Sequence, residues 1–104
     1  MWSAVQGEAD AQFSVGLAYA DGEGVAKDAA KAVEWWQKAA AQGVADAQFS
    51  LARAYRNGKG VPRNAAKAVE WDQKAAAQGV APSQAMLSMA YYYGDGVSKD
   101  IVLA

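Results

Sequence analysis

The sequence of 104 residues contains neither cysteine nor histidine. These two absences exclude disulfide bonds, thiolate zinc sites and cysteine nucleophiles, and they remove the side chain that most often acts as a general base. The charges nearly cancel, with 10 Lys and Arg against 11 Asp and Glu, so no overall field draws an anionic membrane or nucleic acid. No apolar segment reaches the length of a bilayer span. We therefore expect a protein without catalytic residues, cofactor, metal site or membrane partner.

Internal repetition is the strongest feature of the chain. Residues 10–45 and 46–81 align without a gap and share 26 identities in 36 positions. A third and looser copy begins at residue 82, and residues 1–9 match the tail of a unit. The sequence therefore predicts a single repeat domain, 1–104, in which 1–9 is the tail of a preceding unit and 82–104 is a partial third repeat.

Each unit predicts a first helix that ends at a glycine. Ala11, Val15 and Tyr19 recur at i, i+4 and i+8 and define one face of this helix. Asp10 is expected to cap its start, and Gly22 suits the left-handed residue that follows a helix. The equivalent glycines in the other units are Gly58 and Gly94. No segment alternates between apolar and polar residues as a half-buried strand does.

A Gly-x-Gly-Val turn separates the first helix from a second one. The expected N-caps of the second helices are Asp28, Asn64 and Asp100. In the first full unit the second helix has a broad apolar face that ends at Gly43 and consists of Ala29, Ala32, Val33, Trp36, Ala39 and Ala40. Helix pairs this rich in alanine bury too little surface alone, so neighbouring pairs must stack. The predicted fold is an all-α solenoid of antiparallel helix pairs.

The repeated pattern A-x-x-x-L-[GA]-x-x-Y-x-x-G-x-G-V, followed by K-A-x-x-W-x-x-K-A-A-x-Q-G, covers residues 11–43 and 47–79, and more loosely 83–100. It resembles the Sel-one-like repeat family, whose 36-residue units are relatives of tetratricopeptide repeats. This resemblance implies a right-handed superhelix that serves as an adaptor for other proteins, commonly in bacteria, with no shared catalytic residues. The expected location is the bacterial cytoplasm or periplasm, and the first residues show no signal peptide.

Differences between such similar units point to a recognition surface. The least conservative ones fall on a stripe of the first helix, turned away from the Ala11 face. In tetratricopeptide-like solenoids the matching stripe lines the concave groove. Its aromatic, Arg and Met side chains are typical of binding surfaces. We predict that the residues contacting a partner peptide or protein are Phe13, Leu17, Phe49, Arg53, Arg56, Met89, Tyr92 and Tyr93.

Structural explanations for the same residues stay open. Phe13 and Phe49 also suit packing between neighbouring first helices. Arg53 and Arg56 also suit neutral variation on a solvated face. For the whole segment, the alternative is a structural spacer in a longer repeat array that binds no ligand of its own.

One substitution between the units needs a physical explanation, because Trp36 becomes Asp72. The resemblance implies an aromatic residue here, packed toward the next unit. The neighbours of Asp72 one turn away are Ala and Val, so no salt bridge within the helix is available. An unpaired buried polar group costs roughly 2–7 kcal/mol. We therefore predict that Asp72 reaches water or a hydroxyl group of the third unit.

The charge of the middle unit and the apolar residues at the chain ends each suggest a further kind of partner. Residues 46–81 carry six basic and three acidic side chains, net +3, so the middle unit favours an acidic partner. The same cations also suit the phosphate backbone of RNA, which is a more distant alternative because the whole chain is slightly negative and only one unit is basic. Both ends are apolar, with Met1, Trp2 and Val5 at one and Ile101 to Leu103 at the other. Solenoid ends normally carry polar faces, so we expect a fragment of a longer array that self-associates in isolation.

Overall fold

A computed structural model describes residues 2–94 of the chain, with side chains from residue 8 onward. This part contains helices and no strand, so the predicted all-α fold is confirmed. The helices are α1 (Trp2–Asp21), α2 (Ala29–Ala41), α3 (Ala45–Asn57), α4 (Ala65–Ala77) and α5 (Ala81–Tyr93). The predicted cap at Asp100 and the apolar end at 101–103 lie outside the described residues, as does Met1.

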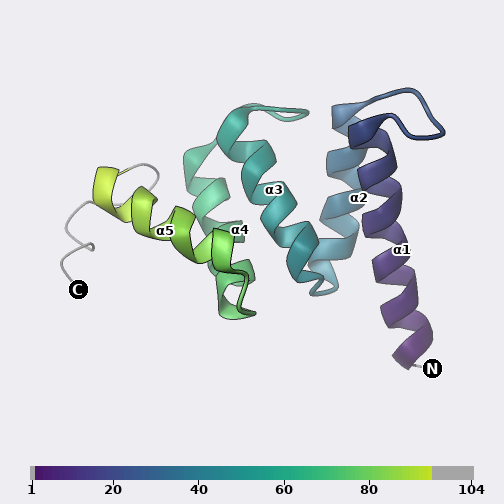
Figure 1. The fold of residues 1–104 in the computed structure, drawn as a ribbon, viewed down its shortest axis with the longest axis horizontal. Helices are drawn as coiled ribbons and strands as arrows, with labels where there is room; N and C mark the ends of the chain where they lie inside the picture. Colours follow the sequence, from purple (N-terminus) through teal and green to yellow (C-terminus); the bar gives the residue numbers. More distant parts are fainter. Residues whose placement is uncertain (1, 95–104) are drawn as a thin grey trace.

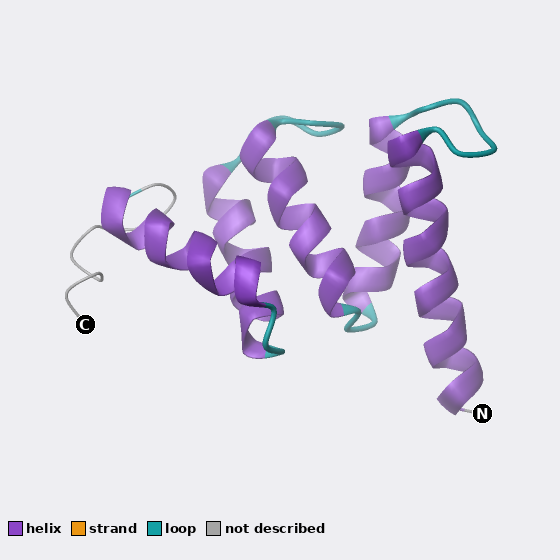
Figure 2. Ribbon diagram, viewed as in Figure 1, coloured by secondary structure: helices purple, strands orange, loops and turns teal. Residues whose placement is uncertain are grey.

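The helices pack in chain order as antiparallel pairs. Figure 1 shows α1, α3 and α5 in one layer and α2 and α4 behind them. The long connections after α1 and α3 lie at one edge of the solenoid, and the short ones after α2 and α4 lie at the other (Figure 2). The molecule is a slab of 44 × 32 × 17 Å, which is two helices thick.

The sequence signals for the second helices are confirmed. Asp28 accepts a hydrogen bond from the backbone N–H of Lys31 at 3.1 Å, and Asn64 accepts the equivalent bond from Lys67 at 3.1 Å. The glycines that end the first helices have left-handed φ angles: Gly22 at 76°, Gly58 at 68° and Gly94 at 73°. These positions favour glycine because a side chain would clash with the backbone there.

The predicted cap at Asp10 is wrong, because α1 begins at Trp2 and already includes Asp10. In the next unit α3 begins at Ala45, after Val44 as the N-cap. The Val44 carbonyl accepts the first helical hydrogen bond, from the N–H of Gln48 at 3.1 Å. Asp46 therefore lies in the first turn, where its carboxylate is favoured by the helix dipole without acting as a cap.

The predicted apolar face of the first helix is buried in α3 and exposed in α1. Ala47 and Leu51 of α3 are both 0% exposed. The equivalent residues of α1, Ala11 and Val15, are exposed. The reason is that this face of α3 packs on α2, whereas no described helix precedes α1.

The core lies between α2 and α3 and is built mainly from small side chains. Its buried residues are Val33, Ala39, Ala40, Ala47, Leu51 and Ala54. Alanine lets helix axes approach closely, and larger residues then seal the edges of the contact. Phe13, Trp36 and Trp71 are partly buried against this cluster. Phe13 thus lies in the packing, as the structural explanation for it proposed.

Glutamine side chains join the two helices of a unit at the edge of the short loops. The amide of Gln78 donates to Gln48 at 3.0 Å and to the carbonyl of Gly43 at 2.9 Å. One unit earlier, the amide of Gln42 donates to Gln12 at 2.8 Å. Because the same pair recurs after 36 residues, these glutamines have a structural role that explains their repetition.

Candidate partner-binding site

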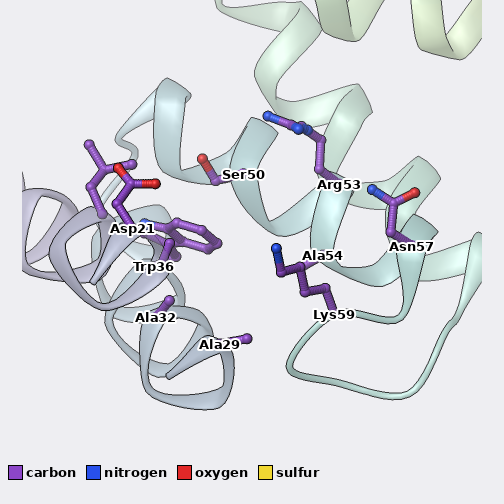
Figure 3. A pocket seen from close by; sticks show the side chains of 11 residues that line it. Asp21, Ala29, Ala32, Trp36, Ser50, Arg53, Ala54, Asn57 and Lys59 are labelled. Carbon is purple, nitrogen blue, oxygen red and sulfur yellow. The ribbon is translucent and has the colours of Figure 1, made fainter. Parts of the chain in front are cut away.

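A partly open cavity of about 220 Å³ lies between α1, α2 and α3 (Figure 3). It is formed where the first unit meets the second. The residues that line it are Leu17, Ala20 and Asp21 from α1, Ala29, Ala32 and Trp36 from α2, and Ser50, Arg53, Ala54, Asn57 and Lys59 from α3 and the turn after it. In Figure 3, Asp21 and Trp36 lie on one side of the cavity and Arg53, Asn57 and Lys59 on the other.

The indole of Trp36 gives the cavity a fixed apolar wall. It packs so closely against the buried backbone of Gly16 that a β-carbon there would lie 2.5 Å from its Cδ1 and Nε1 atoms. The Nε1 atom is itself buried and has no hydrogen-bond partner among the described residues. Leu17 extends this wall and is 39% exposed. An aromatic ring with an exposed leucine beside it can accept an apolar side chain.

The opposite wall is basic. Arg53 is exposed, and its Cζ atom lies 5.8 Å from the centroid of the half-buried Phe49 ring, which holds it by a cation–π contact. Lys59 is also exposed, and among the described residues neither cation forms an ion pair. Asp21 is the one carboxylate among the lining residues, so the lining carries a net charge of +1.

Lys59 is placed at the cavity by its turn. It lies between Gly58 and Gly60, whose φ angles are 68° and 83°. A β-carbon at Gly60 would lie 2.5 Å from the carbonyl oxygen of Ala29, at the start of α2. The turn of the second unit therefore packs directly on the first unit, and this contact brings Lys59 to the rim.

The equivalent position to Trp36 in the second unit is the buried Asp72, which is 1% exposed. Arg56 forms an ion pair with its Oδ2 atom. Ser83 of the third unit is 0% exposed and supplies the predicted hydroxyl group beside the carboxylate. The Asp72 Oδ1 atom and the Ser83 hydroxyl oxygen are both buried, and neither has another hydrogen-bond partner among the described residues.

Burial raises the pKa of Asp72 above its ordinary value. The positive charge of Arg56 and hydrogen bonds from Ser83 and Arg56 act in the opposite direction and offset burial only in part. The charged pair is therefore retained at a cost in desolvation.

Four side chains differ together between the interface around Trp36, where the first unit meets the second, and the interface around Asp72, where the second unit meets the third. The first interface has Gly16, Ala20, Trp36 and Ala47, and 36 residues later the second has Ala52, Arg56, Asp72 and Ser83. The small Gly16 makes room for the indole, and Ala52 leaves no such room. A carboxylate then takes the place of the ring, with Arg56 and Ser83 as its partners. The guanidinium of Arg56 is turned inward, so Arg56 is not the free cation that the sequence suggested.

The predicted site residues are divided among separate places. Leu17 and Arg53 both line the cavity, and the ring of Phe49 contacts the guanidinium of Arg53. Asp21, Trp36 and Lys59 also line the cavity, although they are not among the predicted partner-binding residues. Lys59 differs from the other exposed lysines because it directly precedes Gly60, in the turn that packs on the start of α2.

The other predicted residues of the third unit form a patch of their own on α5. Met89 is 53% exposed, Tyr92 63% and Tyr93 67%. The rings of Tyr92 and Tyr93 stack edge to face, with centroids 5.0 Å apart. This patch does not line the cavity, because its residues come one unit later in the solenoid.

The part of the chain that the structure describes has no group of three or more acidic side chains close enough to hold a metal ion. None of its helices is long and apolar enough to cross a membrane.

Comparison with known proteins places the chain among helical repeats. The family model for the Sel1 repeat matches residues 9–44, 45–80 and 81–104. A protective antigen of uropathogenic Escherichia coli with an SLR fold is 43% identical over 92% of this chain, with a TM-score of 0.87. A Sel1 repeat protein from Oxalobacter formigenes is 38% identical over 95%, with a TM-score of 0.88.

This chain spans 21% of the length of the first solved protein and 41% of the second. No curated protein matches it. Three consecutive matches to one family model and two solved structures of the same fold agree with the repeats, caps and turns described above. The chain belongs to the Sel1 repeat family, whose members generally serve as protein-interaction modules.

Proposed function

We propose that the chain binds an extended segment of a partner protein at the cavity between its first and second units, and that it acts by binding rather than by catalysis. The observation that carries this proposal is the cavity itself, which is lined by an exposed leucine and by two exposed cations without an ion pair among the described residues. Binding sites combine an apolar surface with a few placed polar groups in this way.

Size supports one side chain as the occupant of the cavity. A cavity of about 150 Å³ is enough to hold a benzene ring, and this one is about 220 Å³. A whole helix is about 10–12 Å across and does not fit into such a space. An extended backbone that lies over the opening and inserts a leucine or aromatic side chain does fit.

The proposal is tested by selecting peptides from a random display library on the purified chain. Selected peptides are then measured against Ala20→Trp, in which the new side chain fills the cavity. The equivalent position in the second unit already carries Arg56, so a large residue at position 20 is compatible with the helix. We expect at least about a tenfold loss of affinity, the loss of one well-buried apolar contact.

Ala30→Trp is the matched control, because Ala30 is exposed on α2 and does not line the cavity. It should bind the selected peptides as the parent chain does, and circular dichroism should show equal helicity for both variants. Failure to recover any peptide would instead support the structural spacer. Equal binding by all three proteins would mean that the peptides bind outside the cavity.

A further inference from the structure

We infer that the partner segment is acidic, with an Asp or Glu two positions from the apolar side chain that enters the cavity. This inference rests on the proposed function and adds the chemical class of the partner. It comes from the basic wall of the cavity, Arg53 and Lys59, which lies across from Trp36 (Figure 3), with Leu17 as a further apolar lining residue.

The charges of the lining select a carboxylate. Arg53 and Lys59 are exposed and have no ion-pair partner among the described residues, so both are free to bind an anion. Asp21 opposes them, which leaves a net charge of +1. One carboxylate balances this charge, whereas a phosphate group of about −2 would leave the site with a net negative charge. Arg56 adds nothing, because Asp72 already neutralises it.

The geometry of an extended peptide sets the spacing between the apolar and acidic side chains. Alternate side chains of an extended backbone point to the same side, and residues i and i+2 lie about 7 Å apart. An apolar residue at i can therefore enter the cavity while a carboxylate at i+2 lies on the same side of the peptide and reaches the rim. Adjacent residues point to opposite sides and cannot do both.

The second interface does not repeat this arrangement, which makes the site specific to one place in the array. The positions of Leu17, Trp36 and Arg53 are occupied there by Arg53, Asp72 and Met89. The apolar wall has become charged and the basic wall apolar. The structure therefore assigns the acidic segment to the junction of the first and second units only.

Three synthetic libraries test the inference. Each contains amidated eight-residue peptides with Leu or Phe at one position, and Glu, Gln or Lys two positions later, with the other positions random. Retention on the immobilised chain is read by mass spectrometry. We expect the Glu library to be retained about tenfold more than the Gln library, and the Lys library least.

Two variants that remove the same charge test whether Arg53 and Lys59 cause the preference for Glu. Arg53→Ala/Lys59→Ala should abolish the preference for Glu over Gln. Lys38→Ala/Lys74→Ala removes the same charge from exposed positions outside the cavity and should leave the preference intact. A uridine 12-mer tests nucleic acid as the acidic partner, and tighter binding of this oligonucleotide than of the Glu peptides would overturn the inference.

The results distinguish the acidic partner from the proposed binding function. Equal retention of the Glu and Gln libraries, with loss of both on Ala20→Trp, overturns the acidic partner and leaves the binding function standing. If none of the three libraries is retained but random selection recovers binders, the spacing and charge inferred here are wrong. If random selection also recovers nothing, the proposed function has failed as well.

Discussion

The indole ring of Trp36 lies against the backbone of Gly16, with no space for even one methyl group between them. This contact explains why the repeats differ where they do. A tryptophan on the second helix requires a glycine on the first, and the unit that has Ala52 in place of the glycine has Asp72 in place of the tryptophan. The two residues belong to one interface and cannot change independently.

Gly16→Ala should therefore destabilise the protein. In an ordinary helix this change adds about 1 kcal/mol of stability. Here the new β-carbon would meet the indole at 2.5 Å, and overpacking costs about 1–3 kcal/mol. We expect a net loss of stability in urea unfolding, and Gly16→Ala/Trp36→Phe should recover part of it. A variant more stable than the parent chain would contradict the contact.

Converting the second interface into the first requires all four changes. Asp72→Trp alone should destabilise the chain, because the ring meets Ala52 and leaves Arg56 without its partner. Ala52→Gly/Arg56→Ala/Asp72→Trp/Ser83→Ala should be at least as stable as the parent, since apolar replacement of a buried ion pair is often neutral or stabilising. Thermal unfolding of the two variants measures the difference. If the quadruple variant were no better than Asp72→Trp, the four residues would not form one unit.

Removing only the arginine should be costly and pH-dependent. Arg56→Ala leaves the Asp72 carboxylate buried without its counter-charge, a change that costs roughly 3–5 kcal/mol. We expect the low end of this range, because the Arg56 side chain is 22% exposed. Urea unfolding at neutral pH measures the loss, and it should shrink in acid, where Asp72 is protonated. A loss that did not change with pH would point to packing instead of charge.

The ionisation of Asp72 should oppose folding in the parent chain. Its folded pKa is raised, so the folded state holds the proton more tightly than the unfolded state does. Relative to Asp72→Asn, the free energy of unfolding should fall as the pH rises from the ordinary value of 3.8 and should level off above the folded pKa. Paired pH titrations of stability test this sign. A difference that increased with pH would mean that Arg56 outweighs burial.

Two glycines in equivalent turns should respond differently to the same substitution. Gly24→Ala places a side chain at a φ angle of 76° with no atom nearby, which costs about 1–2 kcal/mol. Gly60→Ala adds to this strain a contact of 2.5 Å with the Ala29 carbonyl, so it should cost about 1–3 kcal/mol more. It should also displace Lys59 from the cavity. Equal losses for both variants would show that the turn does not pack on α2.

The sequence predicted the repeats, the second-helix caps and the turn glycines because each depends on residues close together in the chain. It could not predict Arg56 as the partner of Asp72. The two lie on different helices, and their pairing depends on how those helices pack. The same limit applies to Lys59, which reaches the cavity only through the packing of its turn on Ala29. Repeat symmetry nevertheless carried the information, since position 56 changes together with position 72.

The most direct test of the binding site uses the Trp36 indole as a reporter. The chain has four tryptophans, and single substitutions assign their indole N–H signals in a ¹H–¹⁵N spectrum. Titration with a selected peptide should shift the Trp36 indole signal and the Leu17 and Arg53 amides saturably, while the Trp71 indole stays in place. Shifts confined to the α5 patch of Met89, Tyr92 and Tyr93, with Trp36 unchanged, would contradict the account and move the binding surface to the third unit.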